Sequence, residues 1–344
     1  MQAKTKQRMK YSFVVLVILF SLTAIPAKGH KSVQFIAIGD TPYTQKEDVR
    51  LQQVVAKAIT RAKVPFLVHY GDFKSGALPC TKKLMRQSRD RIYGLLPGRV
   101  FYTPGDNEWT DCDRAKLKPA VSELASLSLI RRLFFRKKMR LPKSWKYQRQ
   151  PNFPENARWM YKGIFFTTLH MVSTNNGRID IQRDDVEYAL AMVEARDAAN
   201  RVWLEESFSL AIKAKAKAMV LVTQADVTDP DGSGACTANH RMHCDAFKSF
   251  RQHLRQQAGN FSQRGKSLLP VLLVHGDTNA YCWDRRFGGT KAPNLWRLNA
   301  WGDFADPADA TVIGIDWKNR KSPFSAKTLV EGHKPAKSCR KRYP

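Results

Sequence analysis

The chain has 344 residues, of which 43% are hydrophobic, which is enough for a large core and gives no indication of disorder. Its 58 lysine and arginine residues outnumber its 30 aspartate and glutamate residues, so the formal net charge is +28 at pH 7. A protein this basic attracts phosphates, nucleic acid or anionic envelope surfaces, whereas the charge says nothing about the fold. Because no linker is evident, we predict one α/β domain over residues 30–333.

Residues 1–29 have the pattern of a secretory signal peptide. A basic start precedes the apolar stretch Tyr11–Ile25, and the small residues Ala27 and Gly29 follow it. Cleavage after Ala27 or Gly29 would make the mature protein secreted or periplasmic. The alternative is an uncleaved membrane anchor, but the apolar stretch is short for a bilayer core of roughly 30 Å.

Strands and helices are predicted to alternate along the rest of the chain. Strands are predicted over residues 33–39, 65–71, 99–104, 163–172, 217–223 and 269–275, with a further β-rich segment at about 295–317. Helices are predicted over about 46–62, 81–94, 113–135, 184–214 and 245–258. Residues 136–157 and 226–244 are predicted to be irregular, and residues 334–344 to form a basic tail. A Rossmann-type cofactor enzyme is disfavoured, because no G-x-G-x-x-G motif follows a strand.

One pattern, an apolar strand-like run closed by Gly-Asp, occurs four times, ending at Asp40, Asp72, Asp106 and Asp277. In open α/β sheets the ligand site lies beyond the carboxyl ends of the strands, and glycine allows the chain to turn sharply there. Four carboxylates at one sheet edge would repel one another unless cations neutralised them. The pattern therefore predicts a metal site with two ions.

The order of these motifs resembles that of the calcineurin-like metallophosphoesterase superfamily, of which this chain would be a divergent, histidine-poor, bacterial-type secreted member. The resemblance covers about residues 33–280 and rests on Gly39–Pro42, Gly71–Phe73, Pro104–Glu108, Trp203-Leu204, Thr223–Asp226 and Gly276–Asn279. It implies a four-layer αββα sandwich, in which two packed mixed β-sheets are flanked by helices. It also implies a metal-dependent phosphoesterase that uses metal-activated water to hydrolyse a phosphate monoester or diester, and hence a phosphate-containing anionic substrate.

The resemblance also implies a set of metal ligands, among which Asp72 would bridge the two ions. This set is Asp40, Asp72, Asp106, Gln224, Asp277 and Asn279. Pro42 stands where the family has a ligand histidine and cannot bind a metal, while Gln224, Asp277 and Asn279 replace further histidines. Because the donors are nearly all oxygen atoms, we expect two divalent or trivalent ions, with Mn, Mg or Fe preferred over Zn.

Proton transfer to the leaving group is the second departure from the family. Asn107 occupies the place of the family's histidine that assists the leaving group; an amide does not titrate but can hydrogen-bond a phosphoryl oxygen. His275 and His170 are the candidate proton donors, and the alternative for each is a histidine satisfied inside a strand. Glu108 is predicted to support the site from behind the ligands.

The six cysteines form an even set, as in proteins of oxidising compartments. Fifteen pairings are open, and our preferred one ties the Asp72 and Asp106 loops together. It consists of Cys80–Cys112, Cys236–Cys244 and Cys282–Cys339. No C-x2-C pair indicates a cysteine zinc site.

The segment Arg131–Arg149 carries nine basic residues and no acidic residue, interleaved with aromatic side chains. It indicates a contact with nucleic acid or an anionic membrane surface, or else a basic rim on an insertion at about residues 131–157. The alternative function is accordingly a catalytically degenerate phosphoesterase-fold protein that binds an anionic polymer or lipid through its basic surface. No obligate protein partner is inferred.

Overall fold

The structure is a computed structural model that describes residues 32–263, 265, 267–278 and 280–339. The predicted signal peptide, residues 1–29, lies outside the described residues. None of the helices in the described part of the chain has the length and apolarity needed to span a membrane.

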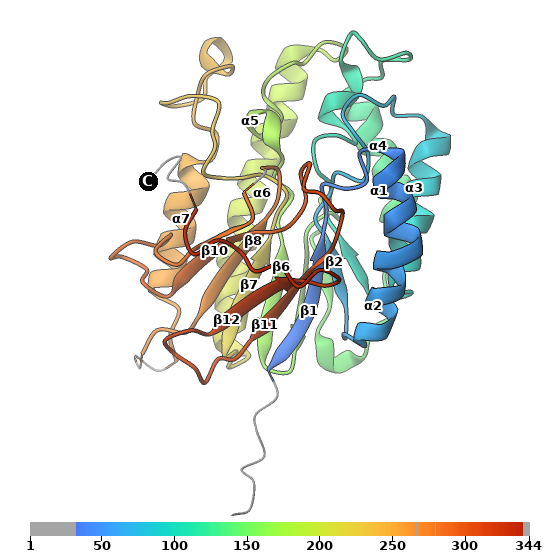
Figure 1. The fold of residues 1–344 in the computed structure, drawn as a ribbon. Coiled ribbons are helices and arrows are strands. Elements are labelled where there is room, and N and C mark those ends of the chain that lie inside the picture. The colour runs from blue at the N-terminus through green and yellow to red at the C-terminus, as the bar shows by residue number, and fades with distance from the viewer. Residues whose placement is uncertain (1–31, 264, 266, 279, 340–344) are drawn as a thin grey trace, which may run out of the picture. The chain divides into compact units, whose positions relative to one another are not determined.

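Two mixed β-sheets form the centre of the fold (Figure 1). The five-stranded sheet has the order β12-β11-β1-β2-β3, and β1, β2 and β3 are parallel. The seven-stranded sheet has the order β4-β5-β6-β7-β8-β10-β9, and β6, β7, β8 and β10 are parallel. The strands are β1 (Val33–Ile38), β2 (Leu67–His69), β3 (Val100–Tyr102), β4 (Gln148–Arg149), β5 (Ala157–Tyr161), β6 (Ile164–Thr168), β7 (Ala218–Val222), β8 (Val271–His275), β9 (Cys282–Asp284), β10 (Leu295–Asn299), β11 (Thr311–Ile315) and β12 (Phe324–Thr328).

Helices cover the outer face of each sheet, with α1 to α4 on one side and α6 and α7 on the other (Figure 1). Between the sheets, Phe35 and Phe66 pack against Trp159 and Phe166. Both faces of β1 are therefore buried, which explains why its sequence is a nearly continuous apolar run. The predicted α/β class and the four-layer sandwich are confirmed.

Four of the helices begin at a polar side chain that caps them. Thr44, Thr81, Ser122 and Asp185 each accept a hydrogen bond from a backbone N–H in the first turn of α1, α3, α4 and α6. The helices are α1 (Gln45–Arg50), which continues through a π-helical turn (Leu51–Val55) into α2 (Ala56–Ala62), then α3 (Lys82–Leu95), α4 (Glu123–Phe134), α6 (Val186–Lys213) and α7 (Lys248–Gly259). The short segment α5 (Ser173–Gly177) contains left-handed residues at Thr174, Asn175 and Asn176.

Several elements differ from the sequence prediction. The predicted helix at 113–135 begins only at Glu123, after a 3-10 turn at Thr110–Asp113. The short strand β4 lies inside the segment predicted to be irregular, and β5, β9 and β12 were not predicted. These strands are short or partly exposed, so they lack the apolar run that marks the central strands.

The aromatic side chains of Arg131–Arg149 point inward. Phe134, Phe135 and Trp145 are buried, and Tyr147 packs against the core between the sheets. The exposed members of the segment are mostly cationic, together with Pro142, Ser144 and Gln148, so these rings are not available for stacking on a bound polymer.

The three preferred disulfides, Cys80–Cys112, Cys236–Cys244 and Cys282–Cys339, are all formed. The last one attaches the C-terminal segment to β9, where Ala336 exchanges backbone hydrogen bonds with Tyr281 and Trp283. Residues 334–339 are thus joined to the folded body, whereas residues 340–344 of the predicted tail lie outside the described part.

Candidate active site

Four carboxylates meet where strands of both sheets end. Asp40, Asp72 and Asp106 follow the neighbouring parallel strands β1, β2 and β3, and Asp277 follows β8 of the other sheet. Carboxylate oxygens of Asp72, Asp106 and Asp277 lie within 4.8 Å of one another. Asp40 joins them because its Oδ2 accepts a hydrogen bond of 2.9 Å from the backbone N–H of Asp277.

The backbone at three of these aspartates is left-handed. Their φ angles are 51° at Asp40, 54° at Asp72 and 69° at Asp277. Non-glycine residues rarely adopt this region, and aspartate and asparagine tolerate it better than most. The same turn at three strand ends directs each carboxylate toward the space between the two sheets.

The glycines before the aspartates make room for other parts of the site, and at Gly105 and Gly276 the neighbour is a carboxylate of another motif. A Cβ atom at Gly105 would lie 2.0 Å from Oδ1 of Asp72, so no larger residue fits there. At Gly71, where φ is +101°, a Cβ would lie 2.1 Å from the backbone nitrogen of Gly105. The Gly-Asp pairs are therefore required by the packing of one strand end against another.

Three of the four carboxylates are buried, with exposed fractions of 1% for Asp40, 2% for Asp72 and 6% for Asp106, and Asp277 is partly exposed. Burial raises the pKa values of Asp40, Asp72 and Asp277 well above the usual range, and neighbouring carboxylates raise them further. The Oδ1 atom of Asp40 has no hydrogen-bond partner within the described structure. A cation would compensate both effects, so this all-oxygen donor set fits a hard metal ion.

Gln224, which follows β7, lies in the middle of this group. Its Nε2 is 3.2 Å from Asp72 Oδ2, 2.9 Å from Asp106 Oδ1 and 3.1 Å from Asp277 Oδ1. Its Oε1 accepts a hydrogen bond of 3.0 Å from the backbone N–H of Ser173, which fixes the orientation of the amide. Gln224 thus presents a donor to the carboxylates, whereas the predicted role as metal ligand would require its oxygen there.

Asn107 and Tyr43 lie on the accessible side of Asp72. The Asn107 Nδ2 donates to Asp72 Oδ2 at 2.9 Å, and the Tyr43 hydroxyl donates to the same oxygen at 3.2 Å. Tyr43 is partly exposed, and its ring packs on the exposed ring of Phe304. Burial of its hydroxyl and the nearby Asp72 raise the pKa of Tyr43, so its hydroxyl stays protonated.

Glu108 lies behind the carboxylates and bonds to the loops that carry them. Its carboxylate accepts hydrogen bonds of 2.9 Å from the backbone N–H groups of Asp72 and Gly105, and one from the hydroxyl of Tyr102. It is completely buried. Glu108 therefore determines how the β2 and β3 loops sit relative to each other.

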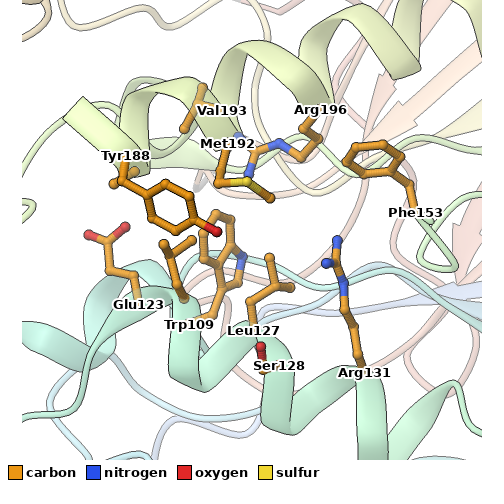
Figure 2. A pocket seen from close by; sticks show the side chains of 12 residues that line it. Trp109, Glu123, Leu127, Ser128, Arg131, Phe153, Tyr188, Met192, Val193 and Arg196 are labelled. Carbon is orange, nitrogen blue, oxygen red and sulfur yellow. The ribbon is translucent and has the colours of Figure 1, made fainter. Parts of the chain in front are cut away.

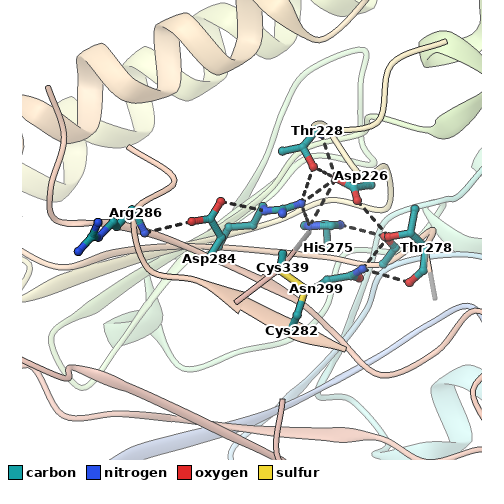
Figure 3. Close-up of a disulfide and its surroundings, with 11 residues drawn as sticks. Asp226, Thr228, His275, Thr278, Cys282, Asp284, Arg286, Asn299 and Cys339 are labelled. Carbon is teal, nitrogen blue, oxygen red and sulfur yellow. Dashed lines mark hydrogen bonds and ion pairs between the residues drawn. A yellow bond between two sulfur atoms is a disulfide. The ribbon is translucent and has the colours of Figure 1, made fainter. Parts of the chain in front are cut away.

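His275 points away from the carboxylates. Its Nδ1 donates to the carbonyl of Gly276 at 2.9 Å, and its Nε2 accepts from the guanidinium of Arg297 at 3.2 Å. Burial lowers the pKa of His275 to about 4, so the ring is neutral at physiological pH. With both nitrogens engaged in this buried network (Figure 3), His275 is not placed to protonate a leaving group.

His170 is also buried away from the carboxylates. Its ring lies 5.4 Å from that of Trp109, measured between centroids, and burial lowers its pKa well below the usual value. Neither ring nitrogen has a hydrogen-bond partner in the part of the chain described here. Trp109 in turn lines a cavity between α4 and α6 (Figure 2). Asn279, the remaining predicted ligand, lies outside the described residues.

Two charged groups near the site were missed by sequence reasoning. Asp303 follows β10. The pKa of Asp40 is raised mainly by burial, the hydrogen bond from the Asp277 N–H lowers it, and the negative charge of Asp303 raises it further. Asp303 belongs to a fifth Gly-Asp pair, Gly302-Asp303, whose preceding strand is less apolar because it contains Arg297 and Asn299. Lys74 is buried two residues after Asp72 and donates to the carbonyls of Ser75 and Leu78.

No known family model matches the sequence, and no curated protein sequence matches it significantly. Among solved structures the chain is similar to GAP50, described as the anchor in the inner membrane complex of Plasmodium, with 11% identity, 91% of each chain covered and a TM-score of 0.46. It is similar to PhoD at 10% identity over 92% of this chain and 76% of that one, with a TM-score of 0.46. It is similar to purple acid phosphatase PPD1 from yellow lupin (Lupinus luteus) seeds at 7% identity over 91% of this chain and 55% of that one, again with a TM-score of 0.46. Similarity at this level says nothing about activity.

Proposed function

We propose that this protein is a metal-dependent phosphoesterase whose ions are held by Asp40, Asp72, Asp106 and Asp277. The observation that carries the proposal is the gathering of largely buried carboxylates from four strand ends, three of them with oxygens within 4.8 Å of one another. Such a group is costly to bury unless cations neutralise it. The motif order noted above supports phosphate esters as the substrate class.

The oxygen-only donor set favours Mn, Mg or Fe over Zn. Ions bound there would polarise a phosphoryl oxygen and lower the pKa of a bound water. Since no histidine among the described residues belongs to the potential ligand group, cations should be held more weakly than in a histidine-rich site.

Tyr43 and Asn107 are the residues that would donate hydrogen bonds to the phosphoryl oxygens of a substrate. Both donate to Asp72 Oδ2 from the accessible side, and each would give up this contact to donate to a phosphate bound beside Asp72. Neither group is a strong acid, and losing a general acid typically slows a reaction by about 10²–10⁴-fold. We therefore expect esters with good leaving groups, such as aryl phosphates, to be the better substrates.

The test combines metal analysis of the purified protein with hydrolysis of an aryl phosphate monoester and an aryl phosphate diester. Mn, Mg and Fe should each be tried, and Asp72→Asn should abolish turnover. Asp90→Asn, a charge change on the exposed surface of α3, is the matched control and should behave as wild type. An inert wild type with all three metals, or full activity in Asp72→Asn, would overturn the proposal.

We also propose that the protein acts in an oxidising compartment, secreted or periplasmic. The support is the pairing of all six cysteines in three disulfides. Sequencing the N-terminus of the protein recovered from the native host tests this: a start after Ala27 or Gly29 agrees, and an intact N-terminus would favour the membrane-anchored alternative.

A second candidate function is binding of an anionic polymer or lipid without turnover. A groove between α3 and the first part of Arg131–Arg149 favours it, because no acidic residue lines this groove. Its cationic side chains are Arg86, Arg89, Arg132, Arg136, Lys137 and Lys138.

Single-stranded oligonucleotide and phosphatidylserine vesicles are the probes for this second candidate, and binding should weaken steeply with salt. Replacing Arg132, Arg136 and Lys137 by alanine should remove it. The same charge loss at Lys213, Lys215 and Lys217, exposed residues elsewhere, should not. Binding that ignores salt, or that both triple variants weaken equally, would exclude the groove.

A further inference from the structure

The turn that follows β10 lies directly beside the carboxylate site. It is closed by a hydrogen bond of 2.8 Å from the backbone N–H of Ala305 to the carbonyl of Gly302. Gly302 packs against Asp40, since a Cβ atom at Gly302 would lie 2.9 Å from the Cβ of Asp40. The Tyr70 hydroxyl donates to the carbonyl of Trp301, just before the turn, at 2.9 Å. The turn is therefore held in place next to one of the four site aspartates.

Both central residues of this turn have a left-handed backbone, with φ angles of 34° at Asp303 and 60° at Phe304. Turns with two such residues favour glycine, asparagine or aspartate at these positions. Asp303 follows this preference. Phe304 does not, because a bulky side chain is rarely found at a positive φ. The conformation of the turn therefore gives no reason for a phenylalanine at position 304.

Burial does not explain Phe304 either. The residue is 70% exposed, the highest value of any large apolar side chain in the described part of the chain. Its ring touches that of Tyr43, with 5.0 Å between the centroids and 59° between the planes, and most of its surface faces solvent. Strained residues persist mainly at functional sites, where the surrounding structure holds them. A strained and exposed aromatic residue beside the carboxylates thus indicates a ligand contact.

Tyr43 connects the Phe304 ring to the carboxylates. The hydroxyl of Tyr43 donates to Asp72 Oδ2 at 3.2 Å, while the ring of the same side chain contacts Phe304. Phe304 is therefore one tyrosine side chain away from the place where a phosphate would bind beside Asp72. A ligand with its phosphate at Asp72 and a second group at this separation would meet the open surface of the Phe304 ring.

We propose that Phe304 stacks on a planar aromatic ring of the substrate, and that the substrate is a phosphate ester of the nucleotide kind. This inference rests on the proposed phosphoesterase function. An exposed aromatic ring is a platform on which every nucleobase can stack. Because Tyr43 separates Phe304 from Asp72, the phosphate and the ring must be joined by a spacer, which the ribose of a nucleotide supplies. Stacking strengthens binding, which is separate from the effect of the leaving group on turnover.

The test is calorimetric titration of the mature protein, in the presence of Mn²⁺, with adenosine monophosphate (AMP) and with ribose 5-phosphate. The two ligands share the sugar and the phosphate and differ in the base, so the ratio of their Kd values isolates the ring. AMP should bind at least about 5-fold more tightly, the lower end of the usual gain for one stacked base. Phe304→Ala should bring the ratio close to one, whereas Phe304→Trp, which keeps a ring, should retain the preference. Tyr188→Ala removes an exposed aromatic side chain from α6 and is the matched control, which should keep the wild-type ratio.

Phe304→Gly separates this role from a structural one. The turn accepts glycine at this position, so the variant should be about as stable as wild type in urea unfolding and should still lose the preference for AMP. A destabilised Phe304→Gly that keeps the preference would show that Phe304 supports the fold instead.

Failure of AMP to bind, equal binding of AMP and ribose 5-phosphate, or a wild-type ratio in Phe304→Ala would overturn the inference. These outcomes differ from a failure of the proposed function, which is decided by turnover of aryl phosphates. A protein that hydrolyses aryl phosphates without preferring AMP keeps the function and loses this inference. One that prefers AMP through Phe304 without any turnover keeps the stacking surface and loses the hydrolysis.

Discussion

The Oδ2 atom of Asp40 lies 1.9 Å from the position that a Cβ atom on Gly276 would occupy. The same oxygen accepts the backbone N–H of Asp277, so two Gly-Asp pairs that are 237 residues apart fit into each other. The glycine of one pair makes room for the carboxylate of the other. This contact links the two sheets at the candidate site, because Asp40 follows β1 and Gly276 follows β8.

Gly276→Ala should therefore destabilise the protein and disrupt the site. Inserting a methyl group into packed structure typically costs about 1–3 kcal/mol. Gly94→Ala is the control, since no atom lies within 4 Å of a Cβ there and the residue is inside α3, where alanine stabilises by about 0.5–1 kcal/mol. Urea unfolding of the metal-free proteins measures both, and equal effects would contradict the packing argument.

Asp40→Asn should stabilise the metal-free protein at pH 7 and abolish its stabilisation by Mn²⁺. Asparagine tolerates the left-handed backbone, its oxygen can still accept the Asp277 N–H, and it carries no buried charge. Each unit by which burial raises a pKa corresponds to about 1.4 kcal/mol, so a gain of at least that size is expected. Thermal unfolding with and without Mn²⁺ is the measurement. A metal-free variant that is less stable than wild type would show that the Asp40 carboxylate does not destabilise the folded protein in the absence of cations.

The pH dependence of stability should include a contribution from Glu123. Burial in the folded state raises its pKa to about 9, above the unfolded value of 4.5, so the folded state binds the extra proton between these limits. The contribution of Glu123 to stability is thus present at low pH and is lost as the pH rises toward 9. Glu123→Gln cannot titrate, so its stability relative to wild type should increase from pH 5 to pH 9. Parallel curves for the two proteins would contradict this.

Gln224→His should shift metal preference toward Zn²⁺. The substitution replaces the amide donor among Asp72, Asp106 and Asp277 by an imidazole, a ligand that suits zinc better than carboxylates alone. We expect Zn²⁺ affinity to rise at least about 10-fold, with a smaller change for Mg²⁺. Competition titrations against a chelator measure both, and an unchanged Zn²⁺ to Mg²⁺ ratio would mean that residue 224 does not reach the bound ion.

The fold and the meeting of the four aspartates could be predicted because both depend on local patterns. Apolar runs mark strands buried on both faces, and Gly-Asp marks their ends. Asp303 was not predicted, since the strand before it carries the buried polar residues Arg297 and Asn299. Those side chains donate hydrogen bonds to residues distant in the sequence, Asp226 and Thr278, which no local pattern reveals.

The orientation of Gln224 and of the histidines could not be predicted for the same reason. Ser173, 51 residues away, determines which end of the Gln224 amide faces the carboxylates. Arg297 takes up the ring nitrogen of His275 that a proton donor would need. Residue type and position at a strand end indicate a place in the fold, but hydrogen-bond partners decide the chemistry.

The disulfide between Cys80 and Cys112 joins the segments that follow Asp72 and Asp106, which Glu108 also connects from the buried side. A covalent link and a buried carboxylate therefore constrain the same pair of loops independently. Reduction of this bond would leave the two loops to non-covalent contacts, namely those of Glu108 and the hydrogen bonds of Asn107 to Asp72. A chain made in a reducing environment would therefore carry the aspartates without the covalent part of the framework that orients them.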